Sequence, residues 1–255
     1  MNIKKVINLL LVVPTGAVVV FLAGCAATDA GSQSGSAGVS WNSSVPKTIN
    51  VQPWSHYKLP GKVPSRFEYV LHDGRDAMAA NASSSASMLR QKVHVEPTSL
   101  GQLMFSWKLP ELIQYADMSV REFDDSPVRV VLAFEGDRTK LSAKNAMLSD
   151  LAHALTGEPL PYATLMYVWC NQCEPLKVIF NPHTDRIRKL PLESGAGKLN
   201  LWLDYERNVR ADFVKAFGEE PGALTSISIM TDTDNTKSTA RAWYGPVSLL
   251  SVSSK

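Results

Sequence analysis

The sequence lacks the short motifs that identify several large enzyme classes. Among its 255 residues there is no G-x-S-x-G segment of a serine hydrolase, and the five histidines have no recognisable triad context. The segment GAGKLN, residues 195–200, has neither the first glycine nor the Ser or Thr after lysine that a phosphate-binding loop requires. These absences argue against a serine hydrolase and against a P-loop nucleotidase.

The chain also has no run of lysines and arginines. It carries 26 basic and 24 acidic residues, and two of the basic ones, Lys4 and Lys5, lie in the first 24 residues, so the rest is formally neutral. Nucleic-acid binding depends on basic side chains that neutralise phosphates. The charge balance therefore argues against a nucleic-acid partner.

Cysteines are few, and the first of the three has a distinctive position. Lys4 and Lys5 precede an apolar stretch, residues 6–22, which Pro14 interrupts and which leads into Leu-Ala-Gly-Cys at Cys25. This order is typical of a secretory signal, and the stretch is too short and broken to predict a membrane span. The segment LAGC resembles the lipobox of bacterial lipoproteins. The alternative is an ordinary secretory signal followed by a chance cysteine.

The lipobox resemblance implies that Cys25 is acylated and that residues 1–24 are removed as a signal peptide. The two alanines after Cys25 stand where an Asp would resemble an inner-membrane retention signal. We therefore expect attachment to the outer membrane, facing the periplasm. Residues 25–45 are rich in Ser, Gly and Ala, which predicts a flexible tether. Residues 46–255 are expected to form a single domain.

Most of this domain predicts β-strands. Residues 101–109 place Leu103, Phe105 and Trp107 on one face, and residues 128–136 are nearly all apolar, as in a central strand covered on both sides. Further strands are expected at 67–71, 87–95, 163–170, 176–180, 186–194, 225–230 and 241–252.

Only two segments have helical spacing. One covers residues 142–156, from Ser142 as N-cap to a stop at Gly157, and the other covers residues 206–217. In the first helix an apolar stripe is formed by Ala146, Leu148, Leu151, Ala152 and Leu155. Many short strands with few helices predict an all-β, two-sheet sandwich, because a parallel α/β sheet needs helices between most strands.

Five segments carry a family resemblance. They are DDSPVRVVLAFEGD, LTGEPLPYATLMYVW, NPHTDRIRKL, AFGEEP and IMTDTDNTKSTARAWYGPVSL. In this order they are similar to successive blocks of DUF3047, a bacterial family of unknown function, from about Trp54 to Leu250. The resemblance implies a galactose-binding-like jelly roll with one or two short helices, a fold shared with many carbohydrate-binding modules. Such a fold analogy does not establish function.

The segment VWCNQCEP contains the other two cysteines, Cys170 and Cys173. We expect a local disulfide that holds the turn between two strands. Two alternatives remain open. A thioredoxin-type redox centre needs its first cysteine at a helix N-terminus, whereas the residues after Cys173 predict a strand. A zinc site with His183 as third ligand has no evident fourth ligand.

Several charged residues lie at the predicted entry to a buried strand. Asp124, Asp125 and Arg129 are interpreted as a structural ion pair or turn, since an unpaired buried charge is costly, with a ligand site as the alternative. Arg207 and Asp212 in the second helix are similar candidates for structural pairing.

The segment TDTDNT connects the last two predicted strands and offers Asp232, Asp234, Asn235 and Thr236 as candidate ligand contacts. It fails the EF-hand pattern, because Lys237 stands where Gly is required. Asp232, Asp234 and Asn235 are candidate ligands for a structural Ca²⁺ of another geometry. Asp and Asn also form turns without a metal, so a plain turn is the favoured interpretation.

Six tryptophans complete the candidate residues. Trp107 and Trp169 lie within apolar strands and are expected in the core, whereas Trp54, Trp202 and Trp243 are candidates for a ligand-binding surface. The favoured function is non-catalytic binding of a cell-envelope glycan, with no cofactor except the Ca²⁺ alternative. Two rival hypotheses are an enzyme that acts on envelope polysaccharide through strand-end carboxylates, and a scaffold that binds other envelope proteins. The carboxylates at strand ends are those of Glu135, Asp137, Asp204 and Glu206.

Overall fold

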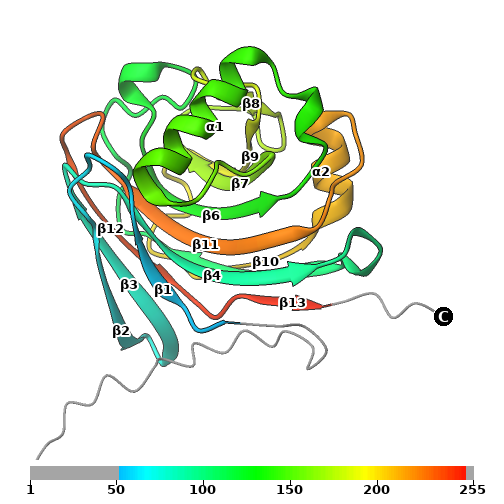
Figure 1. Ribbon diagram of the computed structural model, residues 1–255. Coiled ribbons are helices and arrows are strands. Elements are labelled where there is room, and N and C mark those ends of the chain that lie inside the picture. The colour runs from blue at the N-terminus through cyan, green and yellow to red at the C-terminus, as the bar shows by residue number, and fades with distance from the viewer. Residues whose placement is uncertain (1–51, 251–255) are drawn as a thin grey trace, which may run out of the picture. The chain divides into compact units, whose positions relative to one another are not determined.

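Two facing β-sheets make up most of the structure (Figure 1). The computed structural model describes residues 52–250, which belong to one compact unit, so the predicted signal, Cys25 and the tether lie outside the described residues. Every strand pair is antiparallel except β7 with β9. The first sheet runs β1 (Ser55–Lys58), β4 (Ser87–Val95), β11 (Leu224–Asp232), β6 (Ser126–Phe134), β7 (Ala163–Cys170), β9 (Ile187–Ser194) and β8 (Ile179–Phe180).

The second sheet has six strands. Its order is β10 (Leu203–Asn208), β5 (Gln102–Lys108), β12 (Thr239–Tyr244), β3 (Arg75–Ser83) and β2 (Arg66–His72), with β13 (Ser248–Leu250) beside β5. The core lies between the sheets: Leu103, Phe105 and Trp107 of β5 point inward, and all nine residues of β6 are buried. The predicted all-β, two-sheet jelly-roll sandwich is confirmed.

Helix α2 (Val209–Phe217) closes one end of the core. The Asn208 side chain accepts a hydrogen bond from the Ala211 N–H, and Gly218 ends the helix at φ +72°. Phe213 packs edge-on against Phe134, with ring centroids 4.7 Å apart. The predicted helix over 206–217 began three residues too early, because residues 206–208 pair with β5 as the end of β10.

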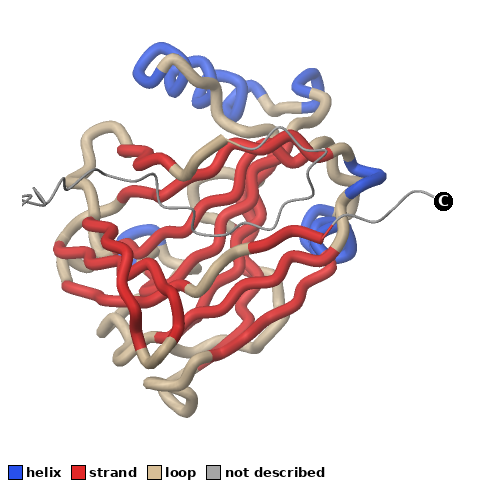
Figure 2. Tube along the Cα trace, turned by 90° about the horizontal axis from the view of Figure 1, so that it is seen from below, coloured by secondary structure: helices blue, strands red, loops and turns tan. Residues whose placement is uncertain are grey.

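Helix α1 (Ala143–Thr156) lies outside the strands (Figure 2). Its ends agree with the prediction: the Ser142 side chain accepts from the Asn145 N–H, and Gly157 takes φ +76°. The apolar stripe does not face the core, because the buried residues are Asn145 and Ser149, whereas Leu151 and Leu155 are exposed. The helix is attached through polar contacts and not through an apolar seam.

Three short 3₁₀ helices complete the structure: η1 (Pro97–Ser99), η2 (Arg121–Phe123) and η3 (Arg138–Lys140). Between residues 52 and 250, neither α-helix has the length and apolarity needed to cross a bilayer.

Candidate functional site

The loop from β11 to β12 joins the two sheets, and Asp125 holds its backbone. The Asp125 carboxylate accepts hydrogen bonds from the Asn235 N–H at 3.1 Å and from the Thr236 N–H and hydroxyl at 2.6 Å each. The Asn235 side-chain amide donates to the Arg121 carbonyl at 2.8 Å, in η2. A carboxylate distant in sequence therefore stabilises a turn that was expected to depend on its own Asp and Asn side chains.

Asp125, Asp232 and Asp234 form one acidic cluster. Their carboxylate oxygens lie within 4.8 Å of one another, and all three residues are buried. Asp232 accepts from the Ser126 N–H at 2.9 Å and from Arg129, and Asp234 pairs with the Lys62 ammonium. Carboxylate oxygens suit Ca²⁺, but an ion here would compete with the ammonium for Asp234. The structural Ca²⁺ at Asp232, Asp234 and Asn235 stays a prediction.

Arg129 connects this cluster to a second buried carboxylate. Its Nε lies 3.1 Å from Asp232 Oδ1, and its Nη2 lies 3.1 Å from Asp124 Oδ1. Lys189 Nζ lies 2.6 Å from both oxygens of Asp124 and donates to the Met118 carbonyl at 2.8 Å. The structure thus pairs Arg129 with Asp124 and with Asp232. Neither Lys189 nor Asp232 was expected in this network.

Arg207 and Asp212 form a second internal pair. Arg207 Nη2 lies 2.6 Å from Asp212 Oδ1 and its Nε lies 2.9 Å from Oδ2, while the Tyr167 hydroxyl donates to Oδ2 at 2.9 Å. The bidentate arrangement ties the start of α2 to β10 and to the core face of β7. We assign it a structural role.

Burial sets the direction of the pKa shifts of Asp232 and Lys189 in the Arg129 network. It raises the pKa of Asp232 to about 6 and lowers the pKa of Lys189 to about 8. Burial also works to lower the pKa of Arg129, but the carboxylates of Asp232 and Asp124 outweigh it and raise that pKa above its usual value. Arg129 therefore remains the fixed positive charge of the network.

The raised pKa of Asp232 predicts a pH dependence of stability. In the unfolded chain this carboxyl has a pKa of 3.8, so between about pH 4 and 6 the folded protein holds a proton that the unfolded chain releases. The contribution of Asp232 to the free energy of unfolding should therefore fall as the pH rises through this window. Urea unfolding across pH 4–7 should show a flatter profile for Asp232→Asn than for the wild type.

Asp150→Asn, which removes an exposed carboxylate of α1, is the control for this measurement. Its pH profile should keep the slope of the wild type. If Asp232→Asn also keeps that slope, Asp232 titrates in the folded protein as it does in the unfolded chain.

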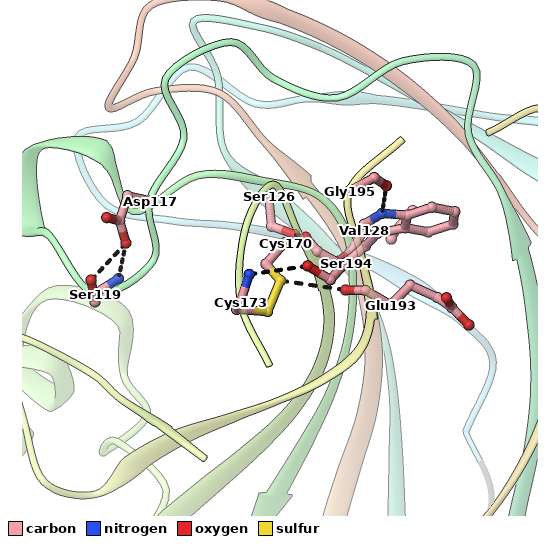
Figure 3. Close-up of a disulfide and its surroundings, with 10 residues drawn as sticks. Asp117, Ser119, Ser126, Val128, Cys170, Cys173, Glu193, Ser194 and Gly195 are labelled. Atoms are coloured by element: carbon pink, nitrogen blue, oxygen red, sulfur yellow. Dashed lines mark hydrogen bonds between the residues drawn. A yellow bond between two sulfur atoms is a disulfide. The ribbon is translucent and has the colours of Figure 1, made fainter. Parts of the chain in front are cut away.

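The disulfide between Cys170 and Cys173 holds the turn after β7 against β9 (Figure 3). Cys170 Sγ lies 3.4 Å from the Glu193 carbonyl, and the Cys173 N–H donates to Ser194 Oγ at 3.0 Å. Cys170 is buried at the end of a strand and lacks the helix N-terminus of a thioredoxin-type centre. With both sulfurs in the disulfide, neither is a thiolate ligand for the zinc alternative that included His183.

A shallow hollow of about 370 Å³ adjoins this disulfide. Phe180 and the Glu174–Lys177 ion pair contribute to its lining. Both charged side chains of that pair are largely exposed to solvent. The hollow thus gathers few fixed polar groups that could orient a ligand.

An aromatic cluster covers part of the outer face of the six-stranded sheet. The rings of His72 and Trp243 stack with centroids 3.9 Å apart and planes 3° apart. Ala77 and Ala79 of β3 lie under this cluster, and Trp202 packs against it. We call this surface the aromatic face, and define it by His72, Arg75, Trp202, Arg241 and Trp243.

Cations cover the aromatic rings of this face. The Arg75 guanidinium lies 5.3 Å from the Trp202 ring centroid, and the Arg241 guanidinium lies 4.8 Å from that of Trp243. Trp243, a candidate from the sequence for a ligand-binding surface, is only 7% exposed. Trp202 is partly buried on the same face, and Trp54 instead packs against the main core.

The aromatic face nevertheless contains unmet hydrogen-bonding groups. Among the described residues, the buried Trp243 Nε1 and His72 Nε2 have no hydrogen-bond partner. Asp73 Oδ2 is the carboxylate oxygen near His72 Nε2, at 3.6 Å. A buried donor left unpaired costs about 1–3 kcal/mol, so the Trp243 N–H favours an additional partner such as water or a ligand hydroxyl.

Polar side chains extend the aromatic face across the sheet. Asn81 of β3 stands opposite Arg66 of β2 on one side and Arg241 of β12 on the other. Arg75 pairs with Asp204 of β10 at 2.7 Å. Directly opposite residues share a face of the sheet, so this row places two guanidinium groups and an amide beside the aromatic cluster.

Comparison with solved structures returns sugar-active proteins at low similarity. The xyloglucanase domain of NopAA from Sinorhizobium fredii, in complex with cellobiose, is 10% identical, with a TM-score of 0.41, and the match covers 78% of this chain and 93% of that chain. Endoglucanase 3 of Trichoderma harzianum, from family GH12, is 5% identical, with a TM-score of 0.38 and coverage of 80% and 97%. A loop-swap mutant of Xyn11A from Necallimastix patriciarum is 10% identical, with a TM-score of 0.35 and coverage of 80% and 100%.

No curated protein matches the chain. The model of the family described as "Protein of unknown function (DUF3047)" matches residues 52–248, most of the sequence. The chain therefore belongs to the DUF3047 family.

Proposed function

We propose that this protein is a lipid-anchored protein of the cell envelope that binds a saccharide on its aromatic face without catalysing a reaction. The observation that carries the proposal is the buried Trp243 indole N–H, which has no hydrogen-bond partner among the described residues, beside two guanidinium groups. Saccharide hydroxyls accept and donate hydrogen bonds, so one hydroxyl of a ligand can accept from the Trp243 N–H while others contact Arg75 and Arg241.

The strand-end carboxylates support the enzyme hypothesis less well. Asp137 accepts hydrogen bonds from the N–H and hydroxyl of Thr139, and these lower its pKa, which is the opposite of what a general acid requires. Asp204 is paired with Arg75. Both side chains already have structural partners, so we favour binding over turnover.

Saccharide binding can be tested by titration calorimetry on the full chain, with soluble peptidoglycan fragments and neutral oligosaccharides as probes. Trp243→Phe keeps an aromatic ring but removes the indole N–H. We expect it to weaken binding by about tenfold or more, since a lost hydrogen bond from a buried donor is worth about 1.4 kcal/mol or more.

Trp54→Phe is the matched control, because Trp54 packs against the main core. It should bind as the wild type does. Equal affinity of Trp243→Phe and the wild type would remove the aromatic face from the proposal. Absence of saccharide binding together with stoichiometric capture of an envelope protein would favour the scaffold hypothesis.

The lipid anchor has its own test. Cells that express the full chain should incorporate a palmitate analogue into the protein, and the protein should fractionate with the outer membrane. Cys25→Ala should abolish the label, because the lipobox motif implies acylation at that thiol. A label that persists in Cys25→Ala, or no label in the wild type, would contradict the anchor.

A further inference from the structure

Helix α1 presents an apolar stripe to solvent. Met147, Leu151 and Leu155 follow one another at intervals of four residues, and they are 65%, 55% and 64% exposed. Residues spaced by four lie one above the other on a helix, so these side chains form one continuous surface. We call it the α1 apolar face.

Polar contacts on the opposite side fix this orientation. The Asn145 amide donates to the Asp185 carboxylate, and the Asn145 side-chain oxygen accepts from the Thr184 hydroxyl at 2.8 Å. One turn later the Ser149 hydroxyl accepts from the Arg138 guanidinium. An inverted helix would bury the leucines but would leave these buried polar groups without partners. The fold therefore holds the α1 apolar face outward.

The size of the face distinguishes between a protein partner and a membrane. Specific protein interfaces use roughly 20–30 residues on each side. Three side chains in a row are too few for such an interface, but each leucine-sized side chain is worth roughly 1.5–3 kcal/mol when moved out of water into an apolar phase. A surface this small is enough for membrane contact when another attachment already holds the protein at the bilayer.

The N-terminal sequence supplies such a link. The segment between the lipobox cysteine and the first described residue covers residues 26–51. If the predicted Ser/Gly-rich tether extends over this length, its end-to-end distance is roughly 30 Å, which keeps a domain close to the membrane and makes a weak contact effective. Lys144 is one turn before Met147, where its ammonium can reach anionic headgroups while its stem contacts lipid.

We propose that the α1 apolar face inserts into the surface of the bilayer to which Cys25 is anchored. The inference rests on the lipid anchor of the proposed function. It orients the domain with α1 at the membrane, on the opposite sheet from the aromatic face. The occupant is the lipid surface, and a second copy of the chain is the alternative that the test must detect.

Spin labelling of the acylated full chain can test the contact. Cys25 is acylated and Cys170 is bonded to Cys173, so Leu151→Cys supplies a single free thiol for a nitroxide. The protein is reconstituted into vesicles of phosphatidylethanolamine and phosphatidylglycerol. We expect the label to collide less often with a water-soluble nickel complex, and more often with oxygen, than in the same labelled protein without vesicles.

Leu71→Cys is the matched control. Leu71 is an apolar residue of β2 that is 72% exposed, and it belongs to the other sheet, so its label should remain accessible to nickel. A third protein carries the label at Ala154, next to the face, with Met147, Leu151 and Leu155 all replaced by serine. Its label should be accessible to nickel, although the protein still floats with the vesicles through its lipid.

Each other outcome overturns the proposal in a recognisable way. Equal nickel accessibility at residues 151 and 71 means that α1 does not touch the bilayer, and it leaves the anchor and saccharide binding intact. Dipolar broadening between labels on residue 151 of two molecules means that a second copy covers the face. In a third outcome, the protein does not float with the vesicles and the nitroxide also reacts with Cys25. The lipid anchor is then absent, and this result overturns both proposals together.

Discussion

Replacing Arg129 with methionine is expected to lower the free energy of unfolding by about 3–5 kcal/mol at pH 7, measured by urea denaturation. Arg129 is the only described cation that contacts both Asp124 and Asp232, and it is buried in the seven-stranded sheet. Methionine fills a similar volume, so the loss reports charge and not a cavity. Without the guanidinium, Asp232 keeps the Ser126 N–H as its hydrogen-bond donor.

The pH provides an internal check on this prediction. Burial raises the pKa of Asp232 to about 6 even though Arg129 lowers it, and removing Arg129 raises it further, so at pH 5 the carboxyl is mostly neutral in the folded variant and needs no cation. The loss should therefore be smaller at pH 5 than at pH 7. Lys177→Met removes the exposed pair with Glu174 and should change stability by less than about 1 kcal/mol. An equally small loss in Arg129→Met would show that the buried carboxylates do not depend on Arg129.

Gly222→Ala is expected to destabilise the protein by about 3 kcal/mol, because the new methyl group has no space. A Cβ on Gly222 would lie 2.3 Å from the Glu135 carbonyl oxygen and 2.7 Å from its carbon. These are backbone atoms, which cannot rotate away as a side chain can. The neighbouring Ala223 carbonyl accepts from the Glu135 N–H at 2.9 Å, so moving either segment breaks the contact that joins the ends of β6 and β11.

Gly197→Ala is the matched control for this substitution. A Cβ on Gly197 meets nothing within 4 Å. Its alanine variant should be as stable as the wild type or slightly more stable, since alanine reduces the freedom of the unfolded chain. Thermal unfolding of both variants distinguishes the clash from a general cost of replacing glycine. A similar melting temperature for the two variants would contradict the close approach at Gly222.

The sandwich was predictable because its central strands bury apolar residues in long runs. Strand β3 was missed because its alanines and Asn81 carry little strand preference. Its alanines serve instead as a flat base for larger rings. The orientation of α1 was also missed. Its leucines suggest an inward stripe, and only the position of Thr184 and Asp185 shows that the polar side is buried.

The candidate site shows a similar limit. The sequence located Asp232 and Asp234, but their neighbour Asp125 lies more than a hundred residues earlier and approaches only because β6 pairs with β11. Trp243 was a candidate for a ligand-binding surface from the sequence, and its ring stacks against His72, which ends β2, two strands away from β12 in the same sheet. Strand register decides both cases, and local sequence pattern does not specify it.

The outermost strands of the seven-stranded sheet bear on self-association. β1 has four residues and β8 has two, so both edges offer few unpaired backbone groups to another strand. Lys58 places a charge at the end of β1, which adds electrostatic repulsion between identical edges. A sheet protected in this way tolerates crowding, because neighbouring copies find little template for intermolecular hydrogen bonding and amyloid-like growth.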